Sequence, residues 1–104
     1  MARSAIQNSE YIRSAEQAAL LRSMAAKMEL AKRINGLLDN FSLSQLEAAR
    51  RLGMPQSKIS AIKNYKLHGI SLERLMQALI SLDQRIEIIV TPNAEHASSI
   101  TVAA

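Results

Sequence analysis

The chain has 104 residues and a mass of 11.4 kDa, the length of one small domain with a short appendage. It has no cysteine and only two histidines, which argues against disulfide scaffolds, thiol catalysis and cysteine or histidine metal clusters. Aromatic residues make up only 3% of the chain, which disfavours binding of nucleic acid by stacking of aromatic side chains on bases. The net charge of +4 favours an anionic partner.

The sequence holds no features of an enzyme or a membrane protein. There is no apolar stretch of 18 residues and no apolar signal core, so we expect a cytoplasmic protein that does not bind a membrane. No nucleophile–base pair and no carboxylate cluster stands out. We therefore predict no catalytic residue, no metal site and no cofactor.

The positive charge is concentrated in the middle of the chain. Residues 41–68 carry five basic side chains against Glu47 alone, whereas residues 69–104 have a net negative charge. This segment is therefore the candidate surface for an anion.

The N-terminal part of the chain is predicted to be helical. It has no glycine or proline before Gly36, and its apolar residues recur at helical spacing. This pattern predicts one long helix, or two helices that break near Ser23. The stripe of Leu20, Met24 and Met28 either folds back on the core or contacts another chain.

The middle of the chain predicts two short helices joined by a tight turn. Ser44 and Glu47 have the spacing of a capping box ahead of the first helix. Gly53 ends that helix, because glycine adopts the left-handed conformation at little cost. Pro55 then suits the start of the second helix, which is expected over residues 56–63.

The spacing within these two helices fits a helix-turn-helix motif. If Gln45 is the first position, a small residue, Ala49, is fifth and Gly53 is ninth. Ile59 and Ile62, at the fifteenth and eighteenth positions, anchor the second helix. Its other face is then free to enter the major groove of DNA.

A further helix, capped by Ser71, is predicted after the motif, and a strand follows it. The run Ile86–Thr91 is rich in β-branched residues and alternates in part, which predicts a strand that ends at Pro92. A lone strand leaves its backbone groups unpaired, so it requires a partner. The candidates are the tail near Ser99–Val102, a symmetry mate or a bound partner.

These elements predict a mostly α fold, a small helix-turn-helix bundle of four to five helices with a short C-terminal β-strand. Residues 1–23 form an N-terminal helical extension, residues 24–82 the DNA-binding domain, and residues 83–104 the strand and a flexible tail. A two-fold dimer would bring two recognition helices to half-sites about 34 Å apart. We therefore predict a homodimer that pairs through Ile86, Ile88 and Val90.

Residues 42–62, SLSQLEAARRLGMPQSKISAI, resemble the helix-turn-helix of the lambda-repressor/Cro-like (XRE) family. With SLERLM at 71–76 and RIEIIV at 85–90, the chain is similar to the HigA-type antitoxins over about residues 24–91. The resemblance implies an all-helical DNA-binding domain, often dimeric, that represses a promoter. For antitoxin members it also implies a partner toxin, usually an RNase, which the protein neutralises.

One feature departs from the family pattern. The family commonly has Ser or Thr at the cap of the recognition helix and Pro two residues later. Here Pro55 holds the cap position and Ser57 the later one. The usual side-chain cap is thereby removed, and it stays open whether Gln56 or Ser57 points deepest into the groove.

The predicted interface uses both polar and basic side chains. In the major groove, Gln pairs with adenine, Ser donates or accepts, and a methyl group packs on thymine. The predicted base-reading residues are Gln56, Ser57, Ser60 and Ala61. Phosphate contacts are predicted for three lysines and for the amide-rich start of the preceding helix, namely Lys58, Lys63, Lys66 and Gln45.

The favoured hypothesis is a sequence-specific transcriptional repressor that is also the antitoxin of a toxin–antitoxin pair and autoregulates its operon. Its partners would be double-stranded operator DNA, a second copy of the chain and a cognate RNase toxin. The alternatives are a stand-alone or phage-derived XRE-type regulator without a toxin, and a module that binds only protein.

Overall fold

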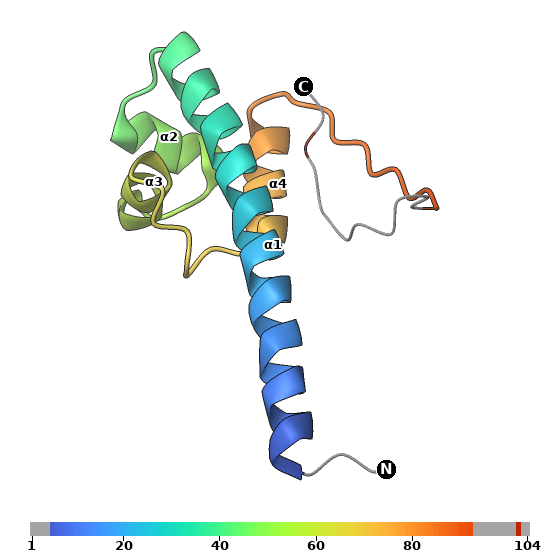
Figure 1. The fold of residues 1–104 in the computed structure, drawn as a ribbon. Coiled ribbons are helices and arrows are strands. Elements are labelled where there is room, and N and C mark those ends of the chain that lie inside the picture. Colours follow the sequence, from blue (N-terminus) through green and yellow to red (C-terminus); the bar gives the residue numbers. More distant parts are fainter. Residues whose placement is uncertain (1–4, 93–101, 103–104) are drawn as a thin grey trace.

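A computed structural model of the chain describes residues 5–92 and Val102, with side chains described from Ser14 onward. Four α-helices lie within the described residues (Figure 1): α1 Ala5–Asn40, α2 Gln45–Leu52, α3 Gln56–Lys63 and α4 Leu72–Ser81. In this view α2 and α3 lie on one side of α1, and α4 lies on the other. None of the described helices is both long enough and apolar enough to cross a membrane.

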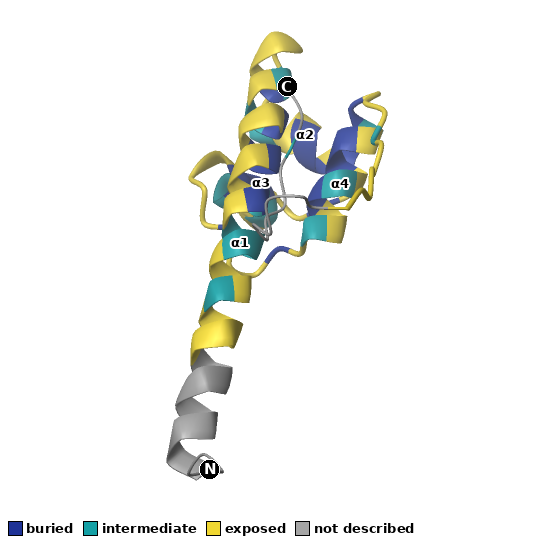
Figure 2. Ribbon diagram, turned by 45° about the vertical axis from the view of Figure 1, so that its right-hand side comes forward, coloured by how far each residue is buried: buried dark blue, intermediate teal, exposed yellow. Residues whose placement is uncertain are grey.

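Helix α1 is one continuous helix of 36 residues, without a break at Ser23. At 1.5 Å per residue it is about 54 Å long. Its C-terminal half carries the residues that join the core, whereas its N-terminal half projects beyond the body (Figure 1). The described side chains of the projecting part, from Ser14 to Leu21, are mostly exposed (Figure 2). The chain therefore extends over 61 × 31 × 17 Å with a radius of gyration of 17.5 Å, against about 13 Å for a compact domain of this size.

The local signals that bound the short helices are confirmed. The Ser44 hydroxyl accepts from the backbone N–H of Glu47 at 3.1 Å, and the Ser71 hydroxyl accepts from that of Arg74 at 3.1 Å. Gly53 ends α2 in the left-handed conformation, at φ 64° and ψ 37°. Pro55 starts α3 without a side-chain cap, as its position in the sequence predicts.

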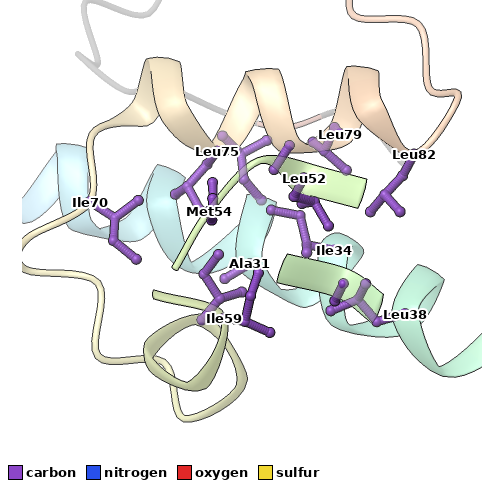
Figure 3. Packing of buried hydrophobic residues seen from close by; sticks show 14 of the residues in the cluster. Ala31, Ile34, Leu38, Leu52, Met54, Ile59, Ile70, Leu75, Leu79 and Leu82 are labelled. Atoms are coloured by element: carbon purple, nitrogen blue, oxygen red, sulfur yellow. The ribbon is translucent and has the colours of Figure 1, made fainter. Parts of the chain in front are cut away.

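The core lies where the four helices meet (Figure 3). Each fully buried aliphatic side chain contributes about 1.5–3 kcal/mol through removal of apolar surface from water. The largest side chains with less than 2% exposure are Ile34, Leu38, Ile59, Ile62, Leu67, Leu75 and Leu82.

The predicted C-terminal strand is wrong. Residues 84–92 leave α4 without forming a strand, and no strand occurs elsewhere in the described part of the chain. The β-branched pattern of Ile86–Thr91 reports only a local preference for extended backbone, whereas a strand also requires a neighbour to pair with. Ile86 instead packs against the helical core, as does Val102. The predicted tail at residues 93–101 lies outside the described residues.

Candidate nucleic-acid interface

Helices α2 and α3 form the helix-turn-helix, and the turn between them is held by backbone and side-chain bonds. The N–H of Met54 donates to the Ala49 carbonyl at 3.0 Å, and Met54 is itself buried. The Arg74 guanidinium on α4 donates to the Gly53 carbonyl at 3.0 Å. The turn is therefore held by a backbone bond to α2 and by a side-chain bond from α4. These two bonds fix the direction of α3 relative to α2.

The inner faces of the two helices match the predicted spacing. Ala49 is buried on α2, and Ile59 and Ile62 are completely buried on α3. The Asn35 side chain on α1 also donates to the Ile62 carbonyl at 3.0 Å. These contacts anchor α3 by one face and leave the opposite face to solvent.

The outward face of α3 is polar and basic. Gln56, Ser57 and Lys63 are exposed, and Ser60 is half-buried between them. Gln56, Ser60 and Lys63 recur at intervals of four and three residues, so they share one side of the helix. The structure therefore brings four of the predicted DNA-contacting residues together on one face.

Two predicted residues of α3 also make contacts within the body of the protein. Ala61 is half-buried and packs against the hydrophobic core. The Lys58 ammonium donates to the Gly69 carbonyl at 3.1 Å and thereby ties α3 to the connection before α4. An ammonium has three donors, so this bond leaves Lys58 with capacity for a further acceptor.

The remaining predicted phosphate contacts lie at the edges of this face. Lys63 and Lys66 are exposed, and neither forms an ion pair with an acidic side chain in the described part of the chain. Gln45 is half-buried at the first position of α2. Two lysines with no acidic partner among the described residues favour contact with a phosphate backbone.

The sequence alone does not reveal the contacts of two polar residues, Arg51 and Asn64. Arg51, one of the five basic residues of segment 41–68, bonds to Asp83 at 2.9 Å, 32 residues away. No local signal identifies such a partner. Asn64 ends α3 and is exposed. The helical spacing of Ser57 and Ser60 continues to Asn64. Asn64 was not included in the predicted helix because it lies next to a turn.

The residues predicted for dimerisation differ in burial. Ile86 is half-buried against the core. Ile88 and Val90 are exposed at 76% and 90%, and Ile89 between them at 79%. The described chain thus presents three consecutive apolar side chains to solvent just after the helical body.

Comparisons with known proteins agree with this geometry. Residues 14–91 match the family model described as "Helix-turn-helix domain". A solved structure titled "Putative XRE Family Transcriptional Regulator" is 43% identical to this chain and superposes with a TM-score of 0.76. The match covers 81% of this chain and 97% of that one, and no curated protein matches. The chain belongs to the XRE family of helix-turn-helix proteins.

Proposed function

We propose that the protein is a DNA-binding transcriptional regulator that represses a promoter by occupying an operator within it. The observation that carries this proposal is the outward face of α3, where polar side chains that can read bases lie beside lysines that pair with no acid in the described part of the chain. Membership of the XRE family supports the same function.

In this proposal α3 lies in the major groove. Gln56 pairs its amide with adenine, while Ser57 and Ser60 donate to or accept from neighbouring base edges. Lys63 and Lys66 contact phosphates and hold the helix in register, since lysine positions a protein on DNA more than it specifies a sequence. The free amides at the start of α2, beside Gln45, add a phosphate contact.

The proposal includes a homodimer, because two half-sites on one side of the duplex require two recognition helices. The exposed run of Ile88, Ile89 and Val90 supports an interface after α4, with Ile86 at its edge. Apolar surface of this kind contributes about 25 cal/mol per Å² when a second chain covers it. The two helix-turn-helix motifs would then be held at a fixed separation.

The finer form of the proposal is a HigA-type antitoxin that neutralises an RNase toxin and autoregulates its operon. The resemblance in sequence supports it, and so does the projecting part of α1, where Leu20 and Leu21 are 59% and 72% exposed. A regulator without a toxin is the alternative. A short basic reading frame beside this one, whose product copurifies with the protein, would favour the antitoxin; its absence would favour the plain regulator.

The direct test is fluorescence anisotropy of the full chain on a labelled duplex from upstream of its own reading frame. Unlabelled duplexes of the same length, with the upstream or a shuffled sequence, serve as competitors. We expect the upstream competitor to be at least ten times more effective, and the double substitution Gln56→Ala and Ser57→Ala to remove that difference. Equal competition by both duplexes would contradict operator recognition. If the protein bound neither duplex, the alternative of a module that binds only protein would be favoured.

A further inference from the structure

Asn64 continues the outward face of α3 by one more turn. Its N–H donates to the Ser60 carbonyl at 3.0 Å, and its φ of −97° and ψ of 8° keep the backbone close to the helical path. Ser57, Ser60 and Asn64 are separated by three and four residues, which places them on one face. Ile59 and Ile62 occupy the opposite face and are completely buried. Asn64 is therefore exposed on the side that the proposed function turns towards DNA.

The side-chain amide of Asn64 is held by its own helix. Its Nδ2 donates to the Ser60 carbonyl at 2.9 Å. A carboxamide has two N–H donors and one carbonyl acceptor, so this bond uses one donor only. The second donor and Oδ1 have no partner among the described residues. Because the amide is already oriented, less side-chain entropy is lost when these two groups bind a ligand.

The two free groups match the major-groove edge of adenine. Adenine presents the N6 amino donor beside the N7 acceptor, which an adjacent amide oxygen and N–H complement. Guanine presents two acceptors in the same place, and each pyrimidine lacks one member of the pair. We infer that Asn64 is a specificity-determining residue that reads an adenine; this inference rests on the proposed DNA binding by α3.

Asn64 would read a different base pair from the residues at the start of α3. It lies seven residues after Ser57, which is about 10 Å along the helix axis. Successive base pairs are about 3.4 Å apart, so the two residues are separated by about three base-pair steps. In homeodomains, base-contacting side chains also span two turns of the recognition helix. Asn64 thus extends the sequence that one protomer reads.

The test is selection of binding sites from a duplex library with a randomised segment. The full wild-type chain is compared with Asn64→Ala and with Gln77→Ala, which removes an exposed amide from α4. We expect the wild type and Gln77→Ala to enrich the same sites, and Asn64→Ala to lose the preference for adenine at one position while other positions are kept. Thermal unfolding by circular dichroism gives the stability cost of the lost cap.

A preference that survives in Asn64→Ala, or an affinity that falls equally on all sequences, would overturn the inference, since Asn64 would then be a helix cap or a phosphate contact. If the wild type enriched no sequence, the proposed function itself would be wrong. If the wild type and Asn64→Ala enriched the same sites, the proposed function would hold and only the inference about Asn64 would be wrong.

A second measurement uses the wild-type chain and so remains decisive if Asn64→Ala does not fold. Each adenine of an enriched duplex is replaced in turn by 7-deazaadenine, which lacks the N7 acceptor. We expect an affinity loss of about 5- to 150-fold at an adenine about three base pairs from the site of Gln56 and Ser57. Insensitivity at every adenine in that part of the site would overturn the inference.

Discussion

The guanidinium of Arg51 donates to the carboxylate of Asp83 at 2.9 Å and thereby joins the end of α2 to the turn that follows α4. Its Nε also donates to the Ser81 carbonyl at 3.2 Å, and the guanidinium carbon lies 5.2 Å from the centre of the Phe41 ring. One side chain therefore connects the C-terminal ends of three helices. The segment that carries Ile88 leaves the body from this point.

We expect Arg51→Ala to lower the free energy of unfolding by about 1–2 kcal/mol. The loss combines an exposed ion pair, a bond to a backbone carbonyl and a contact with an aromatic ring. Asp83→Asn should cost less than about 1 kcal/mol, because an exposed ion pair is screened by water and salt and because Asn, like Asp, tolerates the φ of 63° at this position. Urea unfolding at low and high salt measures both; an Asp83→Asn effect independent of salt would argue against the ion pair.

The two glycines Gly53 and Gly36 should respond to alanine with opposite signs. Neither would meet another atom within 4 Å of an added Cβ, so packing does not decide the result. Gly53→Ala should destabilise by about 1–2 kcal/mol, because Gly53 has a φ of +64°. Gly36→Ala, inside α1, should stabilise by about 0.5–1 kcal/mol. Thermal unfolding of the two variants checks the prediction, and equal signs would contradict it.

Gln56→Ala should lower base discrimination by about 1–3 kcal/mol and leave the fold intact. Gln56 is exposed at the first position of α3, so its removal leaves no cavity. The measurement is the ratio of affinities for operator and random duplex, with the circular dichroism spectrum as the control. An equal loss on both duplexes would make Gln56 a backbone contact.

The double substitution Lys63→Gln and Lys66→Gln should flatten the dependence of log affinity on log salt by about 1.8, at about 0.9 for each phosphate contact. Lys58→Gln serves as the comparison. It should change the slope less and lower stability, because the Lys58 ammonium is bonded to the Gly69 carbonyl. Titrations at several salt concentrations give the slopes. An unchanged slope for the double variant would remove both lysines from the interface.

The double substitution Ile88→Ser and Val90→Ser should convert the proposed dimer to a monomer, as measured by sedimentation equilibrium. Both side chains are exposed, so the helical circular dichroism signal should persist. Operator affinity should fall with the loss of the second recognition helix. A variant that remains dimeric would place the interface elsewhere, and the exposed side chains of Leu20 and Leu21 on α1 would be the next candidates.

Local signals predicted the helix-turn-helix well because its determinants are local. The hydroxyls of Ser44 and Ser71 cap helices within three residues of themselves, and Gly53 acts through its own φ angle. The buried positions of Ile59 and Ile62 follow from helical spacing alone. These features required no knowledge of distant segments.

The errors concern partners that sequence does not reveal. The run Ile86–Thr91 was predicted as a strand from its residue types, although the described chain offers it nothing to pair with. For Lys58 the phosphate contact stays a prediction, but the sequence did not reveal that its ammonium also donates to a carbonyl 11 residues later. Whether α1 breaks near Ser23 was open because serine neither forbids nor favours helix strongly.

The continuity of α1 also has a mechanical meaning. Its C-terminal half is clamped in the core by Ile34 and Leu38, and its Asn35 donates directly to the backbone of α3. The half that projects from the body has no glycine or proline to serve as a hinge. The projecting half is therefore a rigid arm of about 27 Å whose fixed end is bonded to α3. Because the arm has no hinge, a displacement near Leu21 requires the clamped half of α1, and with it the Asn35 bond to α3, to move as well.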